Sequence, residues 1–254
     1  MTPNDQPSAA QSIQVKVAPE ITDGSRPEFD WFANSSKYRE QDGLVNRFLS
    51  QFGLRILRDS TLGQKSKRER WGNHAAELHH HVYGRPWFCG RDDFEMLRAR
   101  GLKPTDTVLD FGCGSMRTGI WTAGFLESDK YFGVDAHRAS LDAAADYEIP
   151  LHGLEPKKPQ LLHSSEFRVD QFGVKFDVIF VASVFSHLTE AQQINALDRI
   201  QSCSKSGSRM YVYHSDLPLD EKRLAERGIK LTERFEVASK FYDKPTQWFE
   251  LLFD

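Results

Sequence analysis

The spacing of apolar residues changes near residue 103, and this change predicts how the chain is organised. Before it, Leu44, Phe48, Leu49 and Phe52 recur on one helical face, so a packed amphipathic helix is expected there. After it, short apolar runs alternate with helical stretches. The predicted strands are TVLDFG, YFGVD, PQLLHS, FDVIFVAS and SRMYVYHSD, followed by KLTERFEVAS and QWFELLFD.

This alternation of strands and helices predicts the fold class. FDVIFVAS is almost wholly apolar, as is typical of a strand buried in a parallel sheet. Strands separated by helices require right-handed crossovers that place helices on the sheet faces. We therefore predict an α/β fold with a doubly wound, mostly parallel seven-stranded sheet and an N-terminal helical extension. Thr189 is predicted to cap the helix TEAQQINALDRIQS.

Three segments follow from these patterns. Residues 1–28 are rich in Pro, Ser, Gln and Asp without a sustained period, so a disordered tail is expected. Residues 29–102 are predicted to form a helical N-terminal cap, and residues 103–254 the α/β domain. In the cap, His79, His80 and His81 are consecutive and cannot share one helical face, which argues against a metal site.

The composition of the chain limits which partners and which cellular compartment are expected. The 254 residues carry 33 basic and 36 acidic side chains, a net charge of −3, so no basic field is available to hold nucleic acid. Cys89, Cys113 and Cys203 form an odd set without paired metal spacing, which favours a reducing compartment. We find neither a signal-peptide core nor a run of roughly 18 apolar residues, so a cytoplasmic protein without a membrane span is expected.

The stretch DFGCGSMRTG, from Asp110 to Gly119, is typical of a nucleotide-binding loop between a strand and a helix. A dinucleotide loop, G-x-G-x-x-G, would need glycine where Arg117 stands. The S-adenosylmethionine loop usually reads D/E-x-G-x-G-x-G and would need glycine where Met116 stands. Both templates fail at their third glycine, and two glycines alone could also form a tight turn that binds nothing.

Asp110 favours S-adenosylmethionine over a dinucleotide. Its carboxylate suits the cationic amino group of a methionine moiety but not a pyrophosphate, which prefers helix-terminal amides. Asp135 ends the second predicted strand and could accept both ribose hydroxyls, as an acid does in dinucleotide folds too. The short remainder after the fifth strand leaves no room for a dehydrogenase substrate domain. An NAD(P)-binding Rossmann oxidoreductase and a non-catalytic cofactor-binding protein of the same fold remain alternatives.

From about Pro86 to Asp254, the sequence resembles the class I S-adenosylmethionine-dependent methyltransferases. VLDFGCGSMRTGI resembles their first motif, YFGVD their acidic second-strand motif, and FDVIFVASVFSHLT their fourth-strand motif. The first motif is similar to that of a bacterial branch with GCGS-x-R-x-G, often preceded by GRPW and an arginine, as in GRPWFCGR here. Under this resemblance, residues 103–254 would be the S-adenosylmethionine-binding methyltransferase domain.

The resemblance implies a role for each residue at the strand ends. Arg117 would clamp the cofactor carboxylate, although it could instead be a surface arginine paired to a neighbouring acid. The residues implied to contact the methionine part are Asp110, Gly112, Cys113, Gly114 and Ser115. Those implied along the ribose, the adenine and the sulfonium side are Asp135, Ala136, His137, Glu166, Phe167, Ala182 and Ser183.

Methyl transfer to an oxygen or nitrogen gains from a base with a pKa near neutrality, and histidine fits that role. His187 and His214 follow the fourth and fifth strands and are the candidates, although each could be structural. Tyr83, Trp87 and Arg91 could form a lid over the cofactor or dock the N-terminal helices onto the sheet. The expected acceptor is a small molecule, sugar or glycan, and the oligomeric state is left open.

Overall fold

The computed structural model describes residues 88–213, 221–238 and 245–254. The predictions for the tail, for the helix around Leu44, for most of the cap, and for Tyr83, Trp87 and His214 lie outside the described residues.

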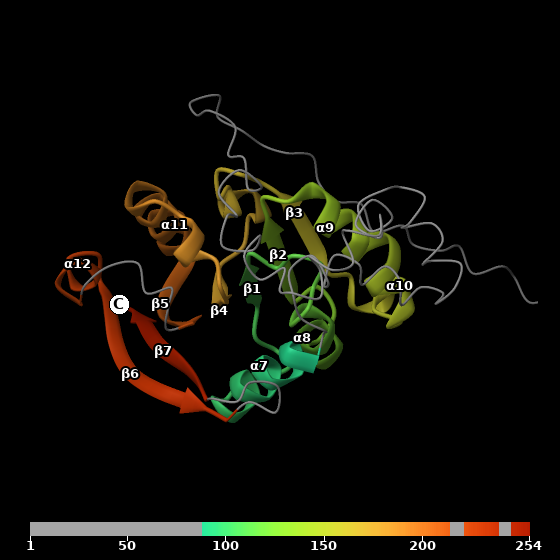
Figure 1. Cartoon of the computed structure of the whole chain (residues 1–254), viewed down its shortest axis with the longest axis horizontal. Coiled ribbons are helices and arrows are strands. Elements are labelled where there is room, and N and C mark those ends of the chain that lie inside the picture. The colour runs from blue at the N-terminus through green and yellow to red at the C-terminus, as the bar shows by residue number, and fades with distance from the viewer. Residues whose placement is uncertain (1–87, 214–220, 239–244) are drawn as a thin grey trace, which may run out of the picture.

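Seven strands form one sheet in the order β3-β2-β1-β4-β5-β7-β6 (Figure 1). The five strands β1 to β5 are parallel to one another, and β7 runs antiparallel to both β5 and β6. The predicted mostly parallel seven-stranded sheet is therefore confirmed. The strands are β1 (Val108–Phe111), β2 (Tyr131–Asp135), β3 (Gln160–His163), β4 (Phe176–Val181), β5 (Ser204–Tyr213), β6 (Ile229–Val237) and β7 (Thr246–Phe253).

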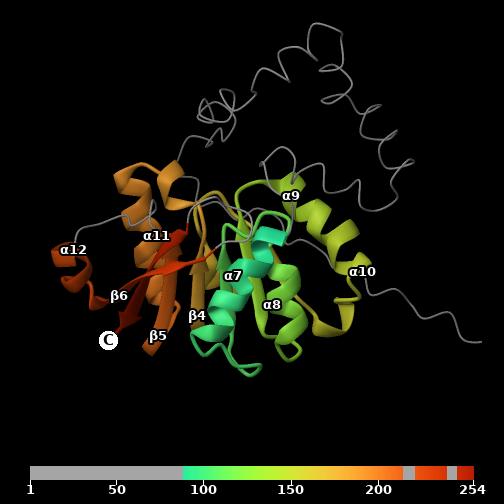
Figure 2. The same cartoon turned by 60° about the horizontal axis from the view of Figure 1, so that its bottom comes forward.

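Helices cover both faces of this sheet. Figure 2 shows α7 and α8 side by side on one face, while α11 lies on the other. The α-helices are α7 (Phe88–Ala99), α8 (Gly119–Phe125), α9 (Arg138–Ala143), α10 (Ile149–Leu151), α11 (Glu190–Ser202) and α12 (Glu221–Ala225). The shorter elements are the π-helix η2 (Ala144–Glu148) and the 3-10 helices η3 (Glu155–Lys157), η4 (Val169–Phe172) and η5 (Phe185–His187).

Two features of these helices bear on the sequence predictions. Thr189 is the N-cap of α11 and forms a capping box with Gln192, which confirms the predicted cap. The stretch HRASLDAAADY has the pattern of a helix ending near Tyr147, but α9 continues through η2 and α10 to Leu151. Pro150 lacks the N–H that an α-helix would use there, and a π-helical segment is one way a helix accommodates such a break.

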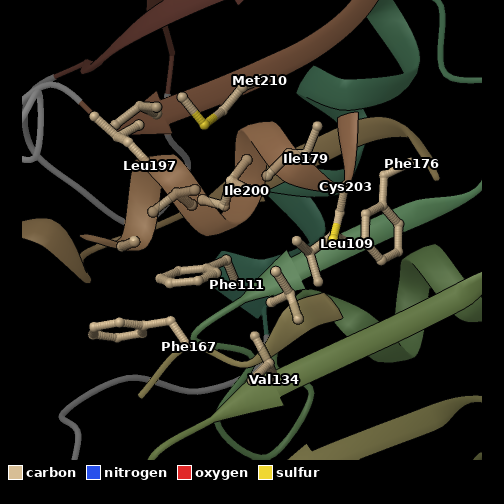
Figure 3. Packing of buried hydrophobic residues seen from close by; sticks show 14 of the residues in the cluster. Leu109, Phe111, Val134, Phe167, Phe176, Ile179, Leu197, Ile200, Cys203 and Met210 are labelled. Atoms are coloured by element: carbon tan, nitrogen blue, oxygen red, sulfur yellow. The ribbon is translucent and has the colours of Figure 1, made fainter. Parts of the chain in front are cut away.

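Alternate residues of each central strand point into two separate cores. On β1, Leu109 and Phe111 join the core under α11, whereas Val108 joins the core under α7 and α8. Figure 3 shows the first of these cores, in which Leu197 and Ile200 of α11 approach the strands. Since both faces of β1 and β4 are buried, their nearly unbroken apolar sequences are explained.

Helix α7 packs on the sheet even though it precedes the predicted domain boundary at residue 103. Phe94 and Leu97 belong to the same buried cluster as Val108 of β1 and Phe180 of β4. The segment that carries GRPWFCGR thus supplies at least one helix to the core of the α/β unit. This position brings α7 next to the glycine-rich loop, as described below.

Candidate functional site

The carboxyl ends of β1, β2 and β4 are adjacent, so the loops that follow them meet. Phe111 at the end of β1 is in register with Val134 of β2 on one side and Val181 of β4 on the other. Open α/β sheets bind ligands at this edge. The candidate site is therefore the group of residues at and just beyond these three strand ends.

The loop after β1 turns through three residues with positive φ: Gly112 at 80°, Gly114 at 53° and Met116 at 67°. At Gly112, an added Cβ would lie 2.2 Å from Cγ2 of Val184, so the loops after β1 and β4 approach closely only because no side chain intervenes. At Gly114, an added Cβ would meet no described atom within 4 Å. This side of the loop leaves space in which a ligand could contact the backbone.

Met116 stands where the S-adenosylmethionine loop usually has its third glycine, and it adopts the left-handed conformation that glycine would favour. A non-glycine residue there costs about 1–3 kcal/mol in backbone strain. The Met116 side chain is fully buried in the core under α7 and α8, and its Cβ lies 2.9 Å from where a Cβ on Gly119 would sit. The left-handed turn is therefore kept, and the side chain points into the core.

Asp110 is a buried acid at the end of β1. Its Oδ2 accepts a hydrogen bond from the hydroxyl of Tyr131, at 2.7 Å. Burial raises the pKa of Asp110 to about 7, while the Tyr131 hydroxyl and the Arg117 charge oppose that rise. The carboxyls of Asp135 and Asp93 add smaller repulsions that raise the pKa of Asp110 further. The site thus holds an acid that a neighbouring cation would favour in its ionised form.

Asp135 joins the loop after β1 to the loop after β2. Its Oδ2 accepts the backbone N–H of Gly114 at 2.7 Å, and its Oδ1 accepts the backbone N–H of His137 at 2.7 Å. Burial raises the pKa of Asp135, and these two amide bonds counteract the rise. A carboxylate offers about four lone-pair positions, so both oxygens retain capacity to accept further hydrogen bonds.

Two histidines flank Asp135. His137 begins α9, with its Nδ1 2.8 Å from Oγ of Ser140, and burial lowers the pKa of His137. His163 ends β3 in register with Asp135, and its Nε2 donates to the carbonyl oxygen of Ala136 at 3.0 Å. The sequence analysis did not single out His163. Its position near the end of the third predicted strand, PQLLHS, is the signal that could have done so.

The other predicted site residues fall into two groups. Glu166 and Phe167 follow β3 and are buried, and the Phe167 ring stacks on Phe111 with centroids 5.3 Å apart (Figure 3). After β4, Ala182 is half-buried, Ser183 is exposed with a φ of 58°, and His187 is half-buried in η5. The ring of Phe167 therefore belongs to the core beneath the site, whereas Ser183 faces solvent.

Cys113 and Ser115 are buried within the loop. The Cys113 sulfur packs over Gly133 of β2, where an added Cβ would lie 2.7 Å from Sγ. Burial raises the pKa of the Cys113 thiol well above its usual range, which disfavours the thiolate. Cys113 is thus a small packing residue whose backbone alone is available to a ligand.

Helix α7 adds a third acid, which the sequence alone did not identify. Asp93 accepts a hydrogen bond from Thr118 Oγ1 at 3.2 Å, and burial raises the pKa of Asp93 to about 6 against the opposing charge of Arg117. Arg91, which we considered for a lid, lies over the ring of Trp121 on α8, 5.6 Å from its centroid. Asp93 of α7 therefore meets the glycine-rich loop through both a hydrogen bond and its charge.

These features fit the methionine and ribose parts of S-adenosylmethionine. The loop offers backbone beside open space at Gly114, Asp110 offers a negative partner to an ammonium group, and Asp135 offers acceptors to hydroxyls. Across the described ranges, no group of three or more histidine, cysteine or acidic residues could hold a metal ion. Nor does any helix in those ranges combine the length and apolarity needed to cross a bilayer.

Comparison with known proteins agrees with this geometry. Residues 109–210 match a family described as a methyltransferase domain. The fold is similar to magnesium protoporphyrin IX methyltransferase from Synechocystis PCC 6803 with bound S-adenosylmethionine, at a TM-score of 0.52 and 16% identity over 78% of this chain and 96% of that one. It is also similar to an S-adenosylmethionine-dependent methyltransferase from Clostridium acetobutylicum ATCC 824, at a TM-score of 0.51 and 12% identity over 71% and 96%.

A third similar structure is the glycopeptide N-methyltransferase MtfA complexed with S-adenosylhomocysteine, at a TM-score of 0.55 and 10% identity over 65% of this chain and 90% of that one. The sheet is thus the Rossmann-like methyltransferase fold. The match over residues 109–210 and this fold together support an S-adenosylmethionine-dependent methyltransferase.

Restoring the usual glycine at Met116 is expected to destabilise the protein. Met116→Gly would relieve about 1–3 kcal/mol of backbone strain, but losing a buried methionine side chain costs about 2–5 kcal/mol. We expect a net loss of about 1–3 kcal/mol in the free energy of unfolding, measured by urea denaturation. Met116→Leu, which keeps the volume, should cost less than about 1.5 kcal/mol. A Met116→Gly protein more stable than wild type would show that strain dominates at this position.

Proposed function

We propose that the protein transfers the methyl group of S-adenosylmethionine to an oxygen or nitrogen of a small molecule, sugar or glycan. The observation that carries this proposal is the pair of carboxylates at neighbouring strand ends, Asp110 and Asp135, on either side of a loop whose Gly114 faces open space. The first can neutralise an ammonium group and the second can accept ribose hydroxyls.

The assignments at the cofactor follow the strand ends. Asp110, Arg117 and the loop backbone from Gly112 to Ser115 would hold the methionine part, and Asp135 the ribose. Because the Phe167 ring is stacked on Phe111, we assign it to the wall beneath the adenine. The residues proposed beside the adenine and the sulfonium side are Ala136, His137, Glu166, Ala182 and Ser183.

The bound cofactor supplies a methyl group on a sulfonium leaving group. The chain therefore has to orient the acceptor, exclude water and, for a protonated nucleophile, remove a proton. His187 is our proposed base because it follows β4 at the ligand-binding edge, in the half-buried turn η5. His214 remains the second candidate from its place in the sequence.

The net charge of the chain supports the proposed class of methyl acceptor. With a net charge of −3, the chain lacks the basic field that nucleic acid binding requires, which favours a small molecule or glycan. We infer from GCGSMRTG that the protein is of the bacterial branch with a GCGSxRxG first motif.

An oxidoreductase is disfavoured because β7 runs antiparallel between β5 and β6, unlike the wholly parallel order of a dinucleotide-binding sheet.

Calorimetric titration with S-adenosylmethionine tests the cofactor. We expect wild type to bind it and to give no heat with NADH. Asp135→Ala should weaken binding by about 1.5–3 kcal/mol, roughly 10- to 150-fold, because bonds to a charged acceptor are lost. Asp142→Ala removes an exposed acid paired with Arg138 on α9 and serves as the control, with unchanged affinity expected. Equal affinities for wild type and Asp135→Ala would remove the ribose assignment.

The affinity for S-adenosylmethionine should fall on the acid side of neutrality. The pKa of Asp110 is about 7 in the ligand-free protein, so the carboxyl is mostly protonated at pH 6 and no longer attracts an ammonium group. Between pH 7.5 and pH 6, the dissociation constant is expected to rise about eightfold. The affinity for 5′-methylthioadenosine, which lacks the amino-acid part, should stay nearly constant. The same slope for both ligands would exclude Asp110 as the ammonium partner.

The base can be tested once an assay of S-adenosylhomocysteine release has found an acceptor. His187→Ala should lower turnover by about 10²–10⁴, and the acidic limb of the pH–rate profile should disappear with it. The dissociation constant for S-adenosylmethionine should change by less than about threefold. His214→Ala should mainly raise the acceptor Michaelis constant. If His187→Ala keeps its turnover and its acidic limb, His187 is structural and the role passes to His214.

A further inference from the structure

Helix α7 contacts the glycine-rich loop so closely that each fixes the position of the other. A Cβ added to Gly90 would lie 2.0 Å from the carbonyl oxygen of Arg117 and 2.8 Å from the backbone nitrogen of Thr118. Real Cβ atoms do not approach backbone atoms this closely, so only glycine permits the contact. The backbone that carries Arg117 is therefore held directly against α7.

Asp93 lies one helical turn beyond Gly90 and faces the same part of the loop. Its Oδ2 accepts the hydrogen bond from Thr118 Oγ1, and the positive charge of Arg117 acts on it. Thr118 is itself buried, and its carbonyl oxygen accepts the N–H of Thr122 in the first turn of α8. Asp93 thus connects α7, the loop and the start of α8.

Arg117 interacts through its charge with two acids. Its charge acts on Asp93 of α7 and on Asp110 of β1, and it lowers the pKa of both. A guanidinium group has five N–H donors in a planar fork, so binding one carboxylate leaves donors for another anion. If Arg117 paired with Asp110, it would neutralise the acid that an ammonium group needs. A second acid on which the Arg117 charge acts removes this conflict.

We propose that Asp93 is a positioning residue, which holds Arg117 away from Asp110 and presents its remaining donors to the carboxylate of the S-adenosylmethionine methionine moiety. This inference rests on the proposed function. The methionine moiety is a zwitterion, and its two charged groups would be bound separately. Asp110 would bind the ammonium group, and Arg117, positioned by Asp93, would bind the carboxylate. Helix α7, from outside the first motif, would thereby become part of the cofactor site.

The test compares three ligands by calorimetry at pH 8, where both acids are ionised. S-adenosylmethionine carries the ammonium and the carboxylate, decarboxylated S-adenosylmethionine keeps the ammonium alone, and 5′-methylthioadenosine has neither. Asp93→Asn keeps the size of the side chain and an oxygen that can accept from Thr118, but it removes the charge. We expect about a tenfold loss of affinity for S-adenosylmethionine and less than a twofold change for the other two ligands.

Two further variants separate positioning from packing. Glu95→Gln removes an exposed charge on the same helix, paired with Arg91, and should leave all three affinities unchanged. In a double-mutant cycle, Asp93→Asn should cost little extra in an Arg117→Lys protein, because the group through which Asp93 acts has already been altered. Additive losses would mean that Asp93 does not act through Arg117.

The outcomes distinguish this inference from the proposed function. If wild type binds neither S-adenosylmethionine nor 5′-methylthioadenosine, the proposed function fails, and this inference with it. If wild type binds both but Asp93→Asn changes neither affinity, or lowers all three by the same factor, only the inference is overturned. In the second case α7 would be a packing element, and urea denaturation of Asp93→Asn would show the matching loss of stability.

Discussion

The carboxylate of Asp135 holds the candidate site together, because it accepts one backbone N–H from each of two loops. Gly114 belongs to the loop after β1 and His137 to the start of α9, and neither N–H has a partner within a helix or strand ladder at that point. Buried backbone donors must be satisfied, so this one side chain sets the separation of the two loops. A ligand that bonds to Asp135 would find both loops already in place.

The second constraint is the close packing of neighbouring segments around the first loop. The loop touches Val184 after β4 through Gly112 and touches α7 through Gly90, and neither position has room for a side chain. Only Gly114 faces open space among these three glycines. Met116 fits this arrangement because its side chain points into the core, where its burial compensates for the strain of its positive φ. The loop thus keeps its shape without the usual third glycine.

The fold could be predicted from the sequence because its signals are local. FDVIFVAS is almost wholly apolar because both faces of β4 are buried. Thr189 forms with Gln192 a capping box that can be recognised within four residues. Asp110 and Asp135 could be assigned to the site because they end strands of a parallel sheet.

The backbone conformation of Met116 could not be predicted, since the sign of its φ depends on the core that receives its side chain. Asp93 lies on α7 just beyond GRPWFCGR, and its tertiary contacts with the loop are what identify it.

The charges of the candidate site would favour a cationic group on a ligand. Asp93, Asp110 and Asp135 are brought near one another, and burial raises the pKa of all three, so their desolvation exceeds the stabilisation that their partners provide. Arg117 offsets part of this cost at Asp93 and at Asp110, and the Tyr131 hydroxyl contributes at Asp110. A cationic group beside Asp110 would stabilise the ionised form of a carboxyl whose pKa burial raises to about 7. Because Asp110 is buried, its attraction to such a group would be strengthened by the low dielectric around the carboxylate.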